Sequence, residues 1–150
     1  MLALSLNTYL HLLSIITIFC ALVAELILIQ EEVNWSRIKR LSKIDGVYGI
    51  AAILVLGTGF VNWMILGKGA EYYNSNTFFI LKIVFFSIVG LISLYPTIQF
   101  ARLKKKHKSD PPETIQISKH KLIRKCILIE LVIMSSIPLL AELMANGLNF

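Results

Sequence analysis

Every long apolar stretch of this sequence contains ionisable side chains. They are His11 and Glu25 in the first stretch, Asp45 at the start of the second, Lys82 in the third, and Glu130 and Glu142 in the fourth. A charged side chain at the centre of a bilayer costs roughly 2.5–3.5 kcal/mol on insertion scales, so such residues usually face a bundle interior, a cofactor or a polar pathway. Any chemistry of this protein is therefore expected at these positions.

The spacing along each stretch predicts how deep each polar residue lies, because an ideal helix rises about 1.5 Å per residue. An outer layer is expected to hold His11, Asn62, Met64, Lys82, Glu142 and Met144. A lone membrane histidine can form a hydrogen bond, transfer a proton, or ligate a metal or haem, and the iron of b-type haem takes a neutral imidazole. His11 is accordingly a candidate haem or metal ligand.

Lys82 has two kinds of expected role. As a structural group it would pair with Glu142 or extend toward the membrane interface. As a functional group it would ligate haem through a neutral amine or hold an anion such as a porphyrin propionate, which makes it the candidate catalytic residue. Asn62 and Glu142 would then shape the rim of the cofactor site. A second histidine ligand from the same chain is not expected, because His107 and His120 fall in a connection.

An inner layer of polar residues is predicted from Glu25, Asp45, Tyr48, Tyr95 and Glu130. The favoured interpretation is structural, with the carboxylates paired to neighbouring basic residues, and a proton or ion route through Glu25 and Glu130 is the alternative. Glu25 follows His11 by fourteen residues, close to four turns, so both share one helix face with Ser14, Ile18 and Leu22. Because that face is apolar between the layers, two separate polar sites are expected, not a continuous channel.

Helices that cross a membrane must position these residues. The chain has 150 residues, of which 56% are hydrophobic, and its mean hydropathy of +0.71 is too high for a soluble domain of this size. A spanning helix needs about 20 mostly apolar residues, and the segments that qualify are 4–29, 45–66, 78–100 and 122–145. We predict an all-α, four-helix transmembrane bundle formed by one domain, residues 1–150.

The net charge of +6 is concentrated in the first and third connections. The positive-inside rule therefore predicts that these connections are cytoplasmic and that both termini are extracytoplasmic. The same basic fringe would attract anionic lipid headgroups. Nucleic acid is not an expected partner, because the basic run at 104–108 lacks interleaved aromatic residues. Within 31–41, Trp35, Ile38 and Leu41 share a face, which predicts a short amphipathic helix at the interface.

Short stretches spread along the chain carry a family resemblance. They are residues 9–13, 21–25, 45–49, 56–59, 79–82, 91–97 and 129–131. In these stretches the chain resembles a family of small four-span bacterial membrane proteins of unknown function. The resemblance covers nearly the whole chain and implies a location in the bacterial inner membrane, but it implies no activity.

A more distant resemblance links the chain to the HemJ-type protoporphyrinogen IX oxidases and the CopD-like membrane proteins. It rests on a first-span histidine between leucines, His11, and on a third-span lysine after an apolar pair, Lys82. The likeness implies haem-related roles for both residues. The short length and the acidic residues of the last span depart from those families, so haem binding is implied more than the oxidase reaction.

The leading hypothesis is a b-type haem membrane protein with a redox or porphyrin-related role, such as a haem-dependent oxidoreductase. His11 would be the axial ligand and Lys82 the second ligand or anion partner. A homo-oligomer is expected because four short helices enclose little volume for a porphyrin, and a membrane redox partner would exchange electrons with it. The alternatives are a proton or small-ion transporter or channel using Glu25, Asp45 and Glu130, and a noncatalytic scaffold or accessory subunit.

Overall fold

Helices make up almost the whole of the computed structural model, which describes residues 1–146. The long helices are α1 (Leu2–Leu28), α2 (Trp35–Val61), α4 (Thr77–Lys106) and α5 (His120–Ala145), and the shorter elements are the π-helical turn η1 (Asn62–Leu66), helix α3 (Ala70–Asn74) and strands β1 (Glu32–Val33) and β2 (Ile115–Gln116). Four of these helices, with η1 continuing α2, are long and apolar enough to cross a membrane. The predicted all-α four-helix transmembrane bundle is confirmed.

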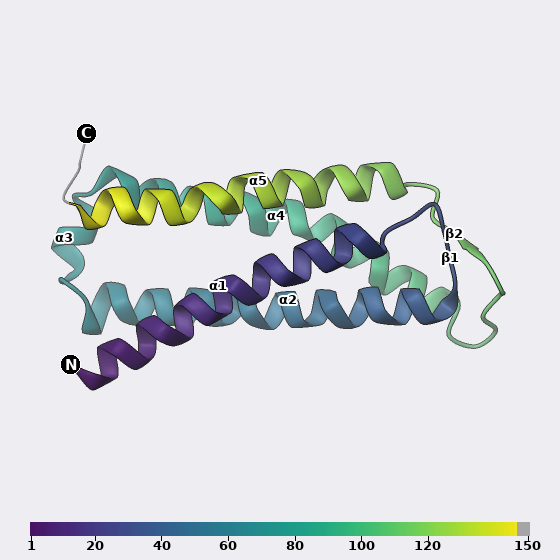
Figure 1. Ribbon diagram of the computed structural model, residues 1–150, viewed down its shortest axis with the longest axis horizontal. Coiled ribbons are helices and arrows are strands. Elements are labelled where there is room, and N and C mark those ends of the chain that lie inside the picture. The colour runs from purple at the N-terminus through teal and green to yellow at the C-terminus, as the bar shows by residue number, and fades with distance from the viewer. Residues whose placement is uncertain (147–150) are drawn as a thin grey trace.

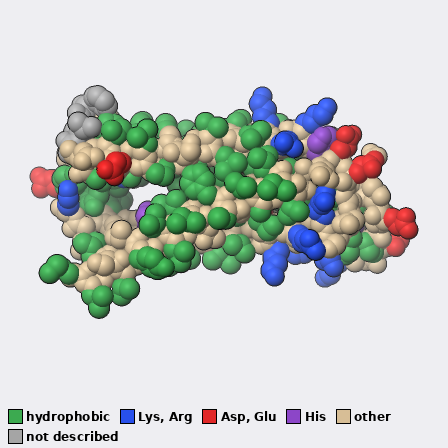
Figure 2. Space-filling view, in the orientation of Figure 1, with side chains coloured by type: hydrophobic (Ala, Val, Ile, Leu, Met, Phe, Trp, Pro, Cys, Tyr) green, Lys and Arg blue, Asp and Glu red, His purple; other side chains and the backbone are tan. Residues whose placement is uncertain are grey.

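The long helices form two antiparallel pairs, in which α1 packs on α2 and α4 packs on α5. The N-terminus and the last turn of α5 lie at one end of the bundle, which we call the terminal end (Figure 1). The strands lie at the opposite end, where Lys and Arg side chains gather, and we call it the basic end (Figure 2). Helix α1 runs obliquely, so it lies beside α2 at the terminal end and approaches α5 toward the basic end (Figure 1).

Asparagine side chains begin two of the spanning helices. Asn34 accepts a hydrogen bond from Arg37 N at 2.9 Å before α2, and Asn76 accepts from Phe78 N at 3.0 Å before α4. Both satisfy backbone N–H groups that have no partner within the first helical turn. The separate amphipathic helix predicted for the first connection is not formed, because α2 begins at Trp35 and continues without a break into the span.

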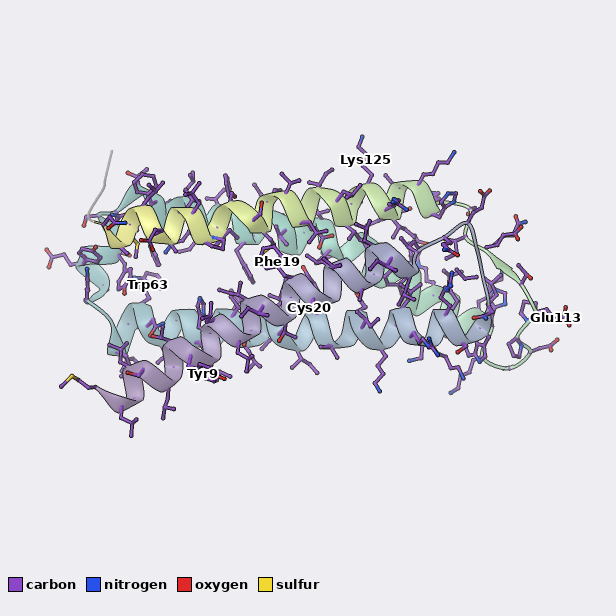
Figure 3. All side chains as sticks on the ribbon, viewed as in Figure 1. Tyr9, Phe19, Cys20, Trp63, Glu113 and Lys125 are labelled. Atoms are coloured by element: carbon purple, nitrogen blue, oxygen red, sulfur yellow. The ribbon has the colours of Figure 1, made fainter. Side chains whose placement is uncertain are left out.

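A small hydrogen-bonded clip joins the first and third connections at the basic end. Strands β1 and β2 pair antiparallel, with Val33 opposite Ile115, and both side chains are buried. The tip beyond the clip is polar, and Glu113 projects from it (Figure 3). The clip fixes the ends of α1 and α2 relative to those of α4 and α5. It therefore holds the two helix pairs together at the basic end.

Lipid-facing and core-facing side chains are clearly separated by exposure. Ile53, Leu91 and Val132 are each 70% exposed, as expected for apolar side chains that face lipid. Ile38 and Leu41, placed at the interface by the sequence pattern, are each 0% exposed and belong to the core. The apolar pattern identified the shared face of these two residues but assigned it to the wrong surroundings.

Candidate functional site

His11 is held by the second helix of its own pair. Its Nδ1 atom lies 2.7 Å from Thr58 Oγ1. The Thr58 hydroxyl has two carbonyl acceptors in its own helix, Leu54 O at 2.5 Å and Val55 O at 3.3 Å. When it donates to one of them, Oγ1 accepts from Nδ1–H of the imidazole, and in that tautomer Nε2 keeps its lone pair for a proton or a metal ion.

An amide pair extends this contact by one turn toward the terminal end. The Asn7 Nδ2 group donates to the Thr58 carbonyl oxygen at 2.9 Å and to Asn62 Oδ1 at 2.8 Å. Asn62 begins the π-helical turn η1, a feature found often at functional sites. Asn7, His11, Thr58 and Asn62 thus fasten α1 to α2. We call these four residues, together with Lys82 and Met144, the His11 site.

Lys82 approaches the His11 site from the other helix pair. It is close enough to His11 for the two side chains to interact electrostatically. Its Nζ atom donates to Met144 Sδ at 3.6 Å and lies 5.7 Å from the centre of the Phe79 ring. The imidazole from α1 thus lies within electrostatic range of an amine from α4, and this amine contacts a thioether from α5. Imidazole and thioether are both ligands of haem iron.

Glu142 does not take part in this site. The ion pair that we considered between Lys82 and Glu142 is not formed, because Glu142 is exposed and its Oε1 atom accepts from Asn146 at 3.1 Å. The helical repeat explains the difference. Twelve residues separate Glu142 from Glu130, which rotates it roughly 120° away from that buried position, whereas Met144 returns to within roughly 40° of it. Met64, also placed in this layer, is 50% exposed.

The two helix pairs leave an opening between them in the half of the bundle that holds the terminal end (Figure 2). His11 and Lys82, one from each pair, are both half-buried. Gly59 lies against the imidazole, and a Cβ atom added there would be 3.4 Å from His11 Cε1. The absence of a side chain at Gly59 therefore leaves room beside the ring on α2.

The inner-layer residues come together as the sequence predicted, in what we call the carboxyl site. Glu25 is 3% exposed and Glu130 is 1% exposed, and Asp45 is close enough to interact electrostatically with both. Tyr48 donates to Glu130 Oε2 at 3.3 Å. Thr97 donates to Asp45 Oδ1 at 2.6 Å. Thr97 belongs to α4, so all four spanning helices contribute to the site; the hydroxyl of Tyr95, also placed in this layer, is buried on the same helix.

The expected ion pairs with basic residues are not formed at the carboxyl site. Glu25 Oε1, Glu130 Oε1 and Tyr95 Oη are buried and have no hydrogen-bond partner among residues 1–146. The charged groups that act on Glu25 are the carboxylates of Asp45 and Glu130. The predicted pairing of these carboxylates with basic residues is therefore wrong for the described residues, because the charges that act on Glu25 and Glu130 are those of other carboxylates.

Apolar side chains separate the carboxyl site from the His11 site. Ile18, Leu22 and Met134 are each 1% exposed, and Val89 is 2% exposed. They fill the core between the two polar groups, in line with the apolar stripe predicted for the first helix. The bundle therefore contains two polar sites and no continuous polar path between them through the described core.

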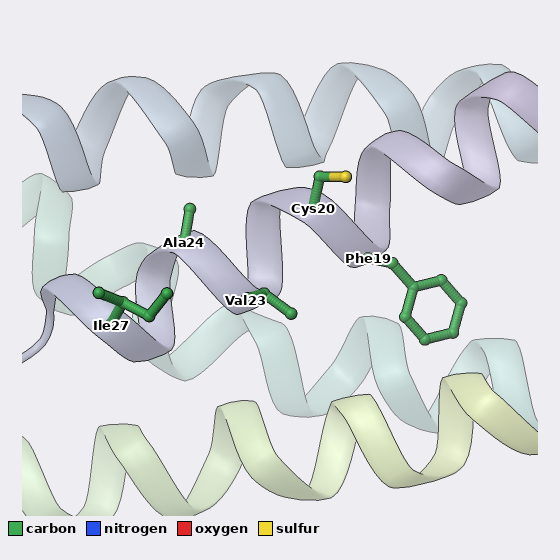
Figure 4. Close-up of a pocket in the computed structure, with 5 residues that line it drawn as sticks. All are labelled: Phe19, Cys20, Val23, Ala24 and Ile27. Carbon is green, nitrogen blue, oxygen red and sulfur yellow. The ribbon is translucent and has the colours of Figure 1, made fainter.

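A surface groove on α1 lies outside both polar sites. Its lining side chains all come from one face of this helix (Figure 4), namely Phe19, Cys20, Val23, Ala24 and Ile27. They are apolar apart from a thiol, so the groove suits a lipid chain better than a reacting group.

A scan against protein-family models decides the family. The model described as predicted membrane protein (DUF2214) matches residues 4–149. The chain belongs to this family. No curated protein and no solved structure matches the chain. The small four-span membrane family expected from the sequence is therefore confirmed, while the family description adds no activity, and the likeness to HemJ-type and CopD-like proteins gains no support from it.

The described residues do not provide enough ligands for a metal centre built from protein side chains alone. No group of three or more His, Cys, Asp or Glu side chains that could hold a metal ion occurs in the described part of the chain, residues 1–146. A structural or catalytic zinc site needs at least three such ligands. His11 as a metal ligand is therefore considered below only with the iron of a porphyrin, which supplies four nitrogen ligands itself.

Sequence reasoning missed Asn7 and Thr58, although a signal for them existed. Asn7 precedes His11 by four residues, and Thr58 precedes Asn62 by four residues. Each pair therefore lies on one face of its helix, one turn apart. Two such pairs on neighbouring antiparallel helices can meet side by side, and the structure places them in that arrangement.

Proposed function

We propose that the protein binds b-type haem at the His11 site and has a redox or porphyrin-related role in the membrane. The observation that carries this proposal is the hydrogen bond between His11 and Thr58. In the tautomer that directs Nδ1–H to Thr58, Nε2 is the atom that would ligate iron. Metal-ligating histidines usually donate their other ring N–H to such a partner, which fixes the tautomer and the ring orientation.

The donor set around His11 fits the iron of a haem. Lys82 and Met144 approach from the opposite helix pair, and an amine or a thioether can each serve as a sixth ligand. Lys82 could instead hold a propionate through its charge, with Asn62 at the rim. Gly59 leaves space at the imidazole edge. Haem bound there would supply one-electron chemistry, while these side chains would bind and orient it.

An absorption spectrum tests the proposal directly. The protein is produced with ample haem, purified in detergent and measured beside His11→Ala. We expect a Soret band that this substitution abolishes. Matched controls are His107→Ala and His120→Ala, which change histidines at the basic end and should retain the band. A wild-type protein without a Soret band, or a band that survives His11→Ala, contradicts haem ligation by His11.

The sixth position is tested by two further substitutions. If Lys82 ligates iron, Lys82→Arg removes a ligand and shifts the haem absorption, because an always-protonated guanidinium cannot bind a metal. If Lys82 holds a propionate, Lys82→Arg keeps the spectrum and Lys82→Met lowers the haem content. Met144→Leu tests whether the Met144 thioether is the sixth ligand instead of Lys82. If it is, Met144→Leu changes the haem spectrum and Lys82→Arg does not.

We also propose that the basic end faces the cytoplasm of a bacterial cell and that both termini lie outside. The support is the band of Lys and Arg around the basic end (Figure 2), which the positive-inside rule places on the cytoplasmic side next to anionic lipid headgroups. Reporter fusions at the two termini should both report the extracytoplasmic side.

Cross-linking in membranes should capture a second copy, and a redox partner would be sought among the proteins captured with it.

A route for ions across the whole bundle has less support than haem binding. The apolar layer of Ile18, Leu22 and Met134 lies between the carboxyl site and the terminal end. Transport would require this layer to open. Proteoliposomes that conduct protons or small ions, and lose this flux in Glu130→Gln, would favour transport. A protein with neither pigment nor flux would favour the noncatalytic scaffold.

A further inference from the structure

The carboxyl site contains buried acid groups that no basic side chain among residues 1–146 is shown to neutralise. Glu25 and Glu130 are 3% and 1% exposed, and one oxygen of each has no hydrogen-bond partner among the described residues. An ionised carboxylate buried without a partner costs many kcal/mol, whereas the neutral acid costs far less. A species with positive charge must therefore accompany these groups when they are buried.

A proton fits this site better than a metal cation. No set of three or more potential metal ligands exists among residues 1–146, so the site lacks the oxygen-rich cage that cations require. A proton on Glu25 or Glu130 would also turn an acceptor into an O–H donor. That O–H group could donate to a neighbouring oxygen of the carboxyl site, where Glu25 Oε1 and Glu130 Oε1 have no donor among residues 1–146.

We propose that Glu25 and Glu130 form a proton-binding site in the core of the bundle, and that this site exchanges protons with the basic end through Asp45. The proposal does not depend on haem binding. It differs from a transport channel because the proton enters and leaves on one side only.

Asp45 is the polar link between this site and the surface. It is half-buried, follows the exposed Lys43 by two residues, and is held by Thr97. A direct approach from the basic end is closed by Phe100 and Ile127, which are both 0% exposed. An approach from the terminal end is closed by the apolar layer described above.

Within the described part of the chain, the charged groups that act on the two glutamates include no basic side chain. The titratable groups that interact with them are Asp45 and Tyr48 from α2 and Cys126 from α5, α1 contributes Glu25 itself, and α4 contributes a buried tyrosine hydroxyl, that of Tyr95. Proton uptake breaks the O–H bond of the Asp45 acid and forms an O–H bond on a glutamate oxygen. A hydronium ion at the basic end then returns a proton to Asp45 and becomes water, so the step balances and no oxidant or reductant is needed.

Infrared spectroscopy of the purified protein tests the binding site, because a protonated carboxyl has a C=O stretch that an ionised one lacks. We expect a carboxylic-acid band at neutral pH that shifts in D₂O. Glu25→Gln and Glu130→Gln should each remove intensity from it while preserving side-chain shape. Glu142→Gln is the matched control, because this exposed glutamate at the terminal end should not contribute. Tyr48→Phe should shift the Glu130 component.

Several outcomes would overturn the proton site. One is a wild-type spectrum without an acid band at neutral pH, and this measurement needs no variant that could misfold. Another is an acid band that neither glutamine substitution changes. A third is loss of the band when sodium or calcium is added at constant pH, which would identify a cation site.

The exchange route is tested by the rate at which the acid band shifts after transfer into D₂O. A positioned acid–base group contributes about 10²–10⁴-fold to proton transfer, so Asp45→Asn should slow the shift by at least about a hundredfold. Lys43→Gln, two residues away on the surface, should leave the rate nearly unchanged. Equal rates in wild type and Asp45→Asn would overturn the role of Asp45.

Discussion

At the His11 site, polar groups of α1 bond directly to polar groups of α2 and of the turn η1 that continues it, whereas at the carboxyl site the acid groups come from three helices and remain partly unbonded. His11, Thr58, Asn7 and Asn62 form a chain of hydrogen bonds of 2.7–2.9 Å. Glu25 and Glu130 are more deeply buried, yet each has an oxygen without a partner.

This difference separates two physical roles for polar groups inside a membrane protein. A bonded group such as His11 is fixed in one orientation and one tautomer, which suits a ligand that waits for a metal ion. An acid with one unpartnered oxygen, such as Glu130, lowers stability in the absence of a proton, which suits a group that binds and releases one. Substitutions that remove polar groups of the His11 site should therefore lower the unfolding free energy of the protein. Apolar substitutions of the acids in the carboxyl site should raise it.

The largest effect is expected from disturbing the turn that positions Asn62. Gly67 N donates to the Asn62 carbonyl oxygen at 2.9 Å. A Cβ atom at Gly67 would overlap that oxygen and lie 2.5 Å from the Tyr73 hydroxyl. Gly67→Ala should therefore cost about 3 kcal/mol of unfolding free energy, measured by denaturation in detergent micelles.

Gly90→Ala is the control for that substitution. No atom lies within 4 Å of a Cβ added at Gly90, so alanine should add roughly 0.5–1 kcal/mol of helix stability. If Gly67→Ala were as stable as Gly90→Ala, the turn at Asn62 would not constrain the His11 site.

The next effect should have the opposite sign. Glu130→Met replaces a buried acid by an apolar side chain of similar length, and it gives up only the 3.3 Å bond from Tyr48. Removing the unsatisfied group should raise the unfolding free energy by about 1–3 kcal/mol, measured in the same micelles. Glu142→Met, at an exposed position, should change it little. A clear loss of stability in Glu130→Met would mean that the acid has a partner in the folded protein.

Sequence reasoning predicted the parts of both sites that depend on one helix at a time. The apolar lengths gave the spans, and the helical repeat placed Ser14, Ile18, Leu22 and Glu25 on one buried face, where all four are at most 3% exposed. The contact between His11 and Thr58 depends on how two helices rotate and slide against each other. The sequence of one helix does not predict that geometry. Glu142 was assigned to the outer layer from its depth alone, although it lies on a different face of its helix from Met144.

The basic end shows the same limit. The basic residues predicted to lie just outside the inner layer, Arg102, Arg124 and Lys125, suggested ion pairs, but long lysine and arginine side chains extend toward the surface. The clip between β1 and β2 joins residues more than eighty positions apart, as with Glu32 and Gln116. Strands of two residues leave no alternating pattern long enough to detect.

Thr58→Val should give a smaller effect than the two substitutions above. It keeps the shape of the side chain but removes the hydroxyl that lies 2.7 Å from His11 Nδ1. The expected loss is about 1–2 kcal/mol, together with weaker haem binding in the absorption assay. Thr17→Val is the matched control, because the exposed Thr17 hydroxyl bonds only to the Leu13 carbonyl oxygen of its own helix at 2.9 Å. Equal stability and haem content in both variants would remove Thr58 from the His11 site.

The smallest effect is expected from Gly59→Ala, which tests how closely the imidazole is held. The added Cβ atom would lie 3.4 Å from His11 Cε1, so the ring must shift by a few tenths of an ångström. Gly57→Ala is the control, because a Cβ atom added at Gly57 meets no atom within 4 Å. It should raise the unfolding free energy by roughly 0.5–1 kcal/mol through helix propensity. In Gly59→Ala, contact with His11 should cancel this gain. Because Nε2 moves with the ring, only Gly59→Ala should also alter the haem absorption. If Gly59→Ala and Gly57→Ala gained the same stability and had the same spectrum, His11 would be free to move. The imidazole would then not be a fixed group, and the contrast with the partly bonded acids of the carboxyl site would not hold.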